Sequence, residues 1–193
     1  MKTLLNQDSL KDLFLESGAL LSGHFQLSSG LHSGQYLQCA LLLADPERAG
    51  LVGEALAGLA PGRPDLVLSP ALGGLIIGHE VARALKRRAF FAERENGVLS
   101  LRRGFVLRPG EKVVVVEDVV TTGGSSEEAI ALARSAGAEV LGALAIVDRG
   151  AGSLGFPLRS LLRMEIPSFK PEDCPLCREG LPLVKPGSRR TTR

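Results

Sequence analysis

The sequence predicts an α/β protein in which helices flank a central, mainly parallel sheet and a small unit precedes that sheet. Apolar runs of strand length alternate with amphipathic segments between residues 65 and 147, which is typical of successive strand–helix–strand units. Residues 113–116 are four consecutive valines, as expected of a strand that is buried on both faces of a parallel sheet. Residues 1–38 lack this alternation, and we expect them to form a smaller cap.

The 193 residues, of which 45% are hydrophobic and 23% charged, fit one globular domain with appended segments. We divide the chain into an N-terminal hood (residues 1–40), an α/β core (residues 41–168) and a C-terminal tail (residues 169–193). The net charge of +2 excludes a general nucleic-acid binder, which needs a strong basic excess. Because the chain has neither a signal-peptide pattern nor an apolar run of about 20 residues, we expect a cytoplasmic protein without a membrane partner.

The hood is predicted to contain one helix and one hairpin. Residues 9–17 form the helix, with Asp8 or Ser9 as its N-cap and Gly18 as its end. Residues 24–38 alternate apolar and polar side chains around a Ser-Gly turn, which predicts a β-hairpin.

The core is predicted to open with a helix from Asp45 to about Leu59, because Asp is a favoured N-cap and the following Pro46 suits the first helical position. Residues 93–111 are polar, and they form either a hairpin or a mobile flap. The remaining elements follow from apolar runs and amphipathic spacing: strands at 65–68, 89–92, 112–120, 140–147 and 159–166, and helices at 75–86 and 127–136.

The segment that carries chemistry follows the four valines. Glu117 and Asp118 lie near the C-terminal end of the strand, and residues 121–126 form a loop of Thr, Gly and Ser before a helix. Ligands of open α/β sheets bind at the carboxyl ends of strands, and a helix N-terminus attracts anions. We therefore predict a phosphate site in the loop. The two acids are better placed to accept hydrogen bonds from a sugar diol or to contact a metal through water. Phosphate beside a diol indicates a ribose 5-phosphate.

Other nucleotide motifs are missing. The chain contains no Gly-x4-Gly-Lys-Ser/Thr sequence and no Gly-x-Gly-x-x-Gly after a strand, which argues against an NTPase or a dinucleotide enzyme.

Residues 117–125 resemble the 5-phosphoribosyl 1-diphosphate (PRPP) signature of the type I phosphoribosyltransferases. The resemblance implies a type I phosphoribosyltransferase-like fold, with the acids on the ribose hydroxyls, the Thr-Gly-Gly-Ser loop on the 5-phosphate, and residues 69–74 on the pyrophosphate. The PRPP-binding residues that it implies are Ala71, Leu72, Gly73, Gly74, Arg94, Arg102, Glu117, Asp118, Thr121, Thr122, Gly123, Gly124 and Ser125.

Three further segments resemble the orotate phosphoribosyltransferase family: residues 23–33, residues 146–150, and the Cys-Pro-Leu-Cys tail with Lys185-Pro186-Gly187-Ser188. This resemblance implies that Arg149 contacts orotate, together with Thr121 and Ser28. A guanidinium suits orotate because it offers two donors to a carboxylate. Taken alone, Arg149 could also be a surface arginine after a strand.

The sequence departs from many members of that family. Gly73 and Ser28 stand where many of them have Lys, and residues 93–104 contain no Lys or His. Arg94 matches the arginine that binds pyrophosphate, so the implied catalytic residues are Arg94, Glu117 and Asp118. Arg102 and Arg103 either supply the remaining positive charge or form a solvated hairpin face.

The resemblance implies an enzyme, a PRPP-dependent pentosyltransferase (glycosyltransferase) that makes orotidine 5′-monophosphate and pyrophosphate in pyrimidine (UMP) biosynthesis. It implies Mg²⁺ as cofactor, carried mainly by PRPP with Asp118 contacting it through water, and a homodimer. Two alternatives stay open: a purine phosphoribosyltransferase, and a non-catalytic regulator that binds PRPP or a nucleotide.

The three cysteines, Cys39, Cys174 and Cys177, are too few for a disulfide scaffold. His24, His32 and His79 are not at metal-ligand spacing, and a structural zinc normally needs four ligands. We therefore expect no protein-bound metal site. The tail pair is interpreted as a turn in which a reversible disulfide can form, and a zinc ion shared by two chains stays an alternative.

Overall fold

The computed structural model describes residues 5–27, 29–150 and 154–186, and it confirms the α/β class. A six-stranded sheet has the order β5-β4-β3-β6-β7-β8, and all neighbours are parallel except β4 and β5. Its strands are β3 (Leu66–Pro70), β4 (Arg88–Glu95), β5 (Val98–Leu101), β6 (Lys112–Val120), β7 (Glu139–Asp148) and β8 (Leu158–Arg163).

Helices cover both faces of this sheet. The side chains of Val114 and Val116 pack with α1 (Gln7–Glu16), α2 (Cys39–Leu43), α3 (Pro46–Ala57) and α4 (Gly73–Leu85). Val113 and Val115 point to the opposite face and pack with α5 (Gly124–Ser135). All four valines have no exposed surface, which explains why the apolar run of β6 is continuous rather than alternating.

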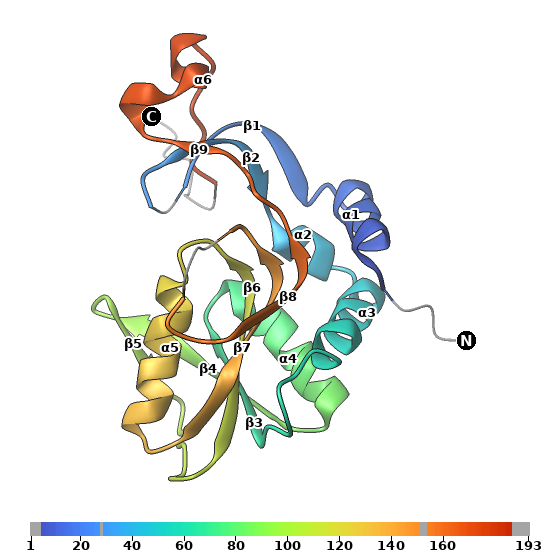
Figure 1. Ribbon diagram of the computed structural model, residues 1–193, viewed down its shortest axis with the longest axis vertical. Helices are drawn as coiled ribbons and strands as arrows, with labels where there is room; N and C mark the ends of the chain where they lie inside the picture. Colours follow the sequence, from blue (N-terminus) through green and yellow to red (C-terminus); the bar gives the residue numbers. More distant parts are fainter. Residues whose placement is uncertain (1–4, 28, 151–153, 187–193) are drawn as a thin grey trace.

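The hood is a second, three-stranded antiparallel sheet built from both ends of the chain. β1 (Leu20–Gln26) pairs with β2 (His32–Leu37) as the predicted hairpin, and β9 (Ser168–Phe169) adds to the other edge of β2. The tail continues through a short 3-10 helix (Pro171–Asp173) and α6 (Pro175–Arg178). Figure 1 shows the tail against the hairpin at one end of the molecule, with the core sheet at the other.

Several element boundaries differ from the prediction. The N-cap of α1 is Asn6, whose side chain accepts from the Ser9 N–H at 2.8 Å, so the predicted caps were wrong. α5 begins three residues earlier than predicted because Gly123 caps it. Of the two alternatives for residues 93–111, the structure has the hairpin, which β4 and β5 form. No described helix is long and apolar enough to cross a membrane.

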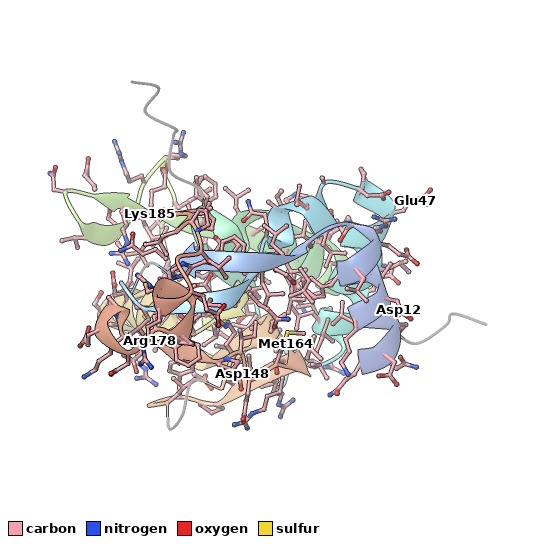
Figure 2. The ribbon with its side chains drawn as sticks, turned by 90° about the horizontal axis from the view of Figure 1, so that it is seen from above. Asp12, Glu47, Asp148, Met164, Arg178 and Lys185 are labelled. Carbon is pink, nitrogen blue, oxygen red and sulfur yellow. The ribbon has the colours of Figure 1, made fainter. Side chains whose placement is uncertain are left out.

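The end of β7 and the segment after β8 are joined directly. The Met164 N–H donates to the Asp148 carbonyl at 2.8 Å, and Figure 2 shows these two residues next to each other. The hydrogen bond holds the chain that leaves the core beside the strand end that carries Arg149, before it enters the hood.

Candidate functional site

A pocket of about 280 Å³ opens where β6 ends and α5 begins. Residues from the hood turn, β4 and α5 complete its wall. It is lined by Ser29, Arg94, Glu117, Val119, Val120, Thr121, Thr122, Gly123, Gly124, Ser125, Ser126 and Glu128. The pocket therefore brings together seven of the predicted site residues, whereas Asp118 and Arg149 do not line it. The seven are Arg94, Glu117, Thr121, Thr122, Gly123, Gly124 and Ser125.

The loop from Thr121 to Gly124 has a shape that only glycine permits at its centre. Gly123 has φ +85°, and a Cβ there would lie 2.5 Å from Leu154 Cδ2. The residue precedes the first turn of α5, whose N–H groups have no side-chain cap. Free N–H groups and the positive end of the helix dipole suit a phosphate. Ser126 adds a buried hydroxyl without a hydrogen-bond partner among the described residues.

The two acids lie side by side at the end of β6 in a desolvated position. Burial, with a further contribution from the charge of Asp118, raises the pKa of Glu117 to about 8. Burial also raises the pKa of Asp118, although its Oδ1 accepts a hydrogen bond from the Val119 N–H at 2.8 Å. At neutral pH Glu117 is thus mainly protonated and can donate as well as accept a hydrogen bond, which suits recognition of hydroxyl groups.

The predicted pyrophosphate loop packs directly on these acids. A Cβ on Gly73 would lie 2.6 Å from Asp118 Oδ1, and a Cβ on Gly74 would lie 2.7 Å from the carbonyl oxygen of Val116. The peptide bond between Ala71 and Leu72 is cis, and the Leu72 side chain is exposed. The start of α4 can therefore approach the acid pair only because residues 73 and 74 lack side chains. None of these four predicted residues lines the pocket wall itself.

Arg94 crosses from β4 to α5. Its Nη1 and Nη2 donate to the two carboxylate oxygens of Glu128 at 2.7 and 2.8 Å, and Nη1 also donates to the Gly97 carbonyl at 2.9 Å. Glu128 was not predicted as a site residue, because only the folded chain brings it to Arg94, which lies 34 residues away in the sequence. Both side chains are more than 40% exposed, so an entering anion can reach Arg94.

Arg102 and Arg103 lie on the β4–β5 hairpin and outside the pocket. Arg103 forms a two-point ion pair with Glu93 at 2.8 and 2.9 Å, and Arg102 lies 3.4 Å from Glu95. In this conformation the two arginines form a solvated hairpin face, which is one of the two alternatives that the sequence allowed for them.

Arg149 follows β7 and is half buried, so it is not an ordinary surface arginine. Its N–H donates to the Val120 carbonyl at 2.9 Å, which ties it to the pocket wall. Nη2 donates weakly to the Ile166 carbonyl at 3.4 Å, whereas the buried Nε has no partner among the described residues. Burial lowers the pKa of Arg149. A buried donor without a partner is costly, and a planar anion would satisfy it. Ser28, the third predicted orotate contact, lies outside the described residues.

Comparisons with known proteins identify relatives along nearly the whole chain. The family described as phosphoribosyl transferase domain matches residues 47–154. An orotate phosphoribosyltransferase of Carboxydothermus hydrogenoformans is 54% identical over 186 residues, which cover 94% of this chain and 97% of that protein. One from Thermotoga maritima is 53% identical over 183 residues, which cover 93% and 98%. The crystal structure of orotate phosphoribosyltransferase from Aeropyrum pernix has a TM-score of 0.70 and 32% identity, and it matches 81% of this chain and 94% of that chain.

Proposed function

The chain belongs to the orotate phosphoribosyltransferase family, and we propose that the pocket at the end of β6 is where it transfers a phosphoribosyl group from PRPP to orotate. The products are orotidine 5′-monophosphate and pyrophosphate. The observation that carries this assignment is one pocket whose wall contains both Glu117, next to Asp118 on β6, and an uncapped helix N-terminus. A sugar diol and a phosphate require these two features next to each other.

The parts of PRPP match different walls of the site. We assign the 5-phosphate to the loop from Thr121 to Ser125 and the ribose hydroxyls to Glu117 and Asp118. The pyrophosphate would then lie toward Arg94 and the backbone of residues 71–74, where Gly73 and Gly74 leave N–H groups accessible. Because Arg94 is already held by Glu128, pyrophosphate would replace one carboxylate partner by a more highly charged one.

Orotate is assigned to the side of the pocket next to Arg149. The carboxylate of orotate would accept from the guanidinium, whose Nε has no partner among the described residues. Thr121 and Ser28 complete the proposed orotate contacts.

The reaction needs no protein nucleophile. Orotate N1 attacks the anomeric carbon, the bond to the pyrophosphate oxygen breaks, and the transition state resembles an oxocarbenium ion, as in glycosyl transfer generally. The chain would contribute by orienting both substrates and by neutralising the charge that develops on the leaving group. We assign this neutralisation to Arg94, which lines the pocket.

The donor set fits a Mg²⁺ ion that enters with PRPP. Among the described residues, the only group of three or more side chains that could hold a metal lies in the hood, and the pocket wall offers the carboxyl groups of Glu117 and Glu128, with Asp118 next to Glu117. Mg²⁺ keeps several waters and prefers phosphate oxygens to an all-protein cage. It would supply charge neutralisation on pyrophosphate, with Asp118 contacting it through water.

We further propose a cytoplasmic homodimer. Exposed Leu41, Leu51 and Ile76 lie on α2, α3 and α4 and provide apolar surface for a second copy. The three free cysteines suit a reducing compartment.

The Asp118→Ala variant tests the assignment of the pocket. The wild type should convert orotate and PRPP with Mg²⁺ present, and the variant should lose at least about 100-fold in kcat/KM, or ~2.7 kcal/mol of transition-state stabilisation. Calorimetry with PRPP measures binding separately. A protein that binds PRPP tightly and never turns over would instead be a regulator.

A further inference from the structure

Four side chains that could bind a metal meet in the hood, and none of them lines the pocket. His24 lies on β1, His32 begins β2, and Cys174 and Cys177 come from the tail about 150 residues later. Their ligand atoms all lie within 4.8 Å of one another, and every residue except Cys177 is buried. Their spacing along the chain does not indicate this cluster, which forms because the hairpin and the tail pack together.

Four of the six separations between the ligand atoms are close to the edge lengths of a tetrahedron around zinc. Zn–S bonds of about 2.3 Å and Zn–N bonds of about 2.0–2.1 Å place tetrahedral ligands about 3.3 Å apart for N and N and about 3.5 Å apart for N and S. In the structure, His24 Nε2 lies 3.1 Å from His32 Nδ1 and 3.5 Å from Cys174 Sγ. Cys177 Sγ lies 3.7 and 3.3 Å from the same two ring nitrogens.

The hydrogen bonds around the cluster orient one ligand for a cation. His24 Nδ1 lies 2.8 Å from the Leu181 carbonyl, which can only accept, so Nδ1 carries the proton. Nε2 is then unprotonated, and its lone pair is directed at the other three ligand atoms. A backbone carbonyl that fixes the tautomer of a ligating histidine is a common feature of zinc sites.

The tail supplies its two thiols from one short turn. Cys174 caps α6 and Cys177 lies within it, so the Cys-x-x-Cys spacing puts both sulfurs on the side that faces the hairpin. Both cysteines are free.

We propose that His24, His32, Cys174 and Cys177 bind one Zn²⁺ ion within a single chain. Two thiolates and two imidazoles select zinc over Mg²⁺ or Ca²⁺, which prefer oxygen ligands. Because all four positions are filled by protein, the site is structural and leaves no open position for a substrate. Each coordinating thiol gives up its proton when it binds the metal.

The ion would fasten the tail to the hairpin that reaches the pocket. Val184 already pairs with β1, since its N–H donates to the His24 carbonyl at 2.8 Å and its carbonyl accepts from the Gln26 N–H at 2.8 Å. His32 directly follows the turn that carries Ser29 into the pocket wall. Figure 2 labels Arg178 and Lys185, two residues of the tail that packs on this hairpin. Metal binding thus fixes the base of that turn.

Metal analysis of untagged protein tests the proposal without any assay of catalysis. After exhaustive dialysis against metal-free buffer, elemental analysis should find about one zinc per chain. Protein reconstituted with Co²⁺ should show the visible absorption bands of a tetrahedral thiolate site. The Cys177→Ser and His32→Ala variants should each bind zinc at least tenfold more weakly in competition with a coloured chelator. The matched controls Cys39→Ala and His79→Ala should bind it like the wild type.

Two results would overturn the proposal. One is wild-type protein that holds no zinc and does not compete with the chelator at a 1:1 ratio. The other is mass spectrometry of protein kept under reducing conditions that finds Cys174 and Cys177 joined by a disulfide. Both readouts use the folded wild type, so they stand even where a variant fails to fold, and neither depends on the proposed transferase reaction.

Discussion

Gly73 lies against Asp118 so closely that a Cβ on the glycine would be 2.6 Å from the Oδ1 atom of the acid. The first residue of α4 therefore packs directly against the C-terminal part of β6. This relationship gives a physical reason for glycine at position 73: in this backbone arrangement any side chain there would displace the carboxylate.

The Gly73→Ala variant should lose activity through that displacement. Overpacking costs about 1–3 kcal/mol, so we expect kcat/KM for PRPP to fall about 5- to 150-fold. Steady-state kinetics measure the change. Gly50→Ala on α3 is the matched control, because a Cβ there meets only the flexible ends of the Arg83 and Glu80 side chains. Equal activity of Gly73→Ala and the wild type would show that Asp118 does not need this position.

Gly123→Ala should destabilise the fold. The variant combines a positive φ with a Cβ 2.5 Å from Leu154, and we expect the free energy of unfolding to fall by about 1–3 kcal/mol. Urea denaturation measures it. Gly18→Ala separates the two causes, since Gly18 has φ +64° with no atom within 4 Å of its Cβ position. If both variants lose the same amount, the contact with Leu154 contributes nothing.

The raised pKa of Glu117 makes stability depend on pH. Between the ordinary value of 4.5 and about 8, the folded chain holds a proton on Glu117 that the unfolded chain has lost. The free energy of unfolding should therefore fall as pH rises through this window, by up to about 1.4 kcal/mol per pH unit from this group. Urea denaturation at pH 5.5 and pH 8 should give a smaller fall for Glu117→Gln. An unchanged pH dependence in that variant would contradict the assignment.

Glu128 should compete with pyrophosphate for Arg94. Arg94→Ala should raise KM for PRPP, and Arg94→Lys should rescue it only partly because Lys cannot make the two-point contact. Glu128→Gln weakens the ion pair and should lower KM for PRPP. Arg134→Ala, at the far end of α5, controls for the loss of one positive charge and should leave KM unchanged. A higher KM in Glu128→Gln would mean that Glu128 positions Arg94 instead of competing for it.

Arg149→Ala should affect one substrate selectively. Loss of a charged donor should raise KM for orotate about 10-fold or more while KM for PRPP stays within about twofold. Initial rates with each substrate varied in turn measure both constants. Equal increases in KM for orotate and KM for PRPP would mean that Arg149 supports the structure of the whole site and does not contact orotate specifically.

The sequence predicted the elements whose pattern is local. β6 was found with its observed ends because an apolar run bounded by a charge and a Thr-Gly-Gly loop has few alternative structures. The cap at Asn6 was missed because Ser9, which the sequence offers as a cap, takes the third helical position and bonds back to Asn6.

Features that depend on packing could not be read from the sequence. The contact of Arg94 with Glu128 joins β4 to α5, and the zinc ligands proposed here join residues of the hairpin to the tail. The spacing of residues along the chain does not indicate which distant residues come into contact. A metal site that joins His24 and His32 to Cys174 and Cys177 could therefore not be predicted from the sequence. Likewise, the tight fit at Gly73 follows only from the approach of α4 to β6.

The transfer reaction with a choice of bases tests most directly whether the pocket at the end of β6 serves orotate. Purified protein is mixed with PRPP and Mg²⁺ and with orotate, adenine, hypoxanthine or uracil, and the loss of orotate absorbance and the release of pyrophosphate are followed. We predict rapid, equimolar consumption of orotate and release of pyrophosphate, with no reaction of the other three bases. Turnover of a purine base, or PRPP binding without turnover of any base, would rule out the assignment of the pocket to orotate.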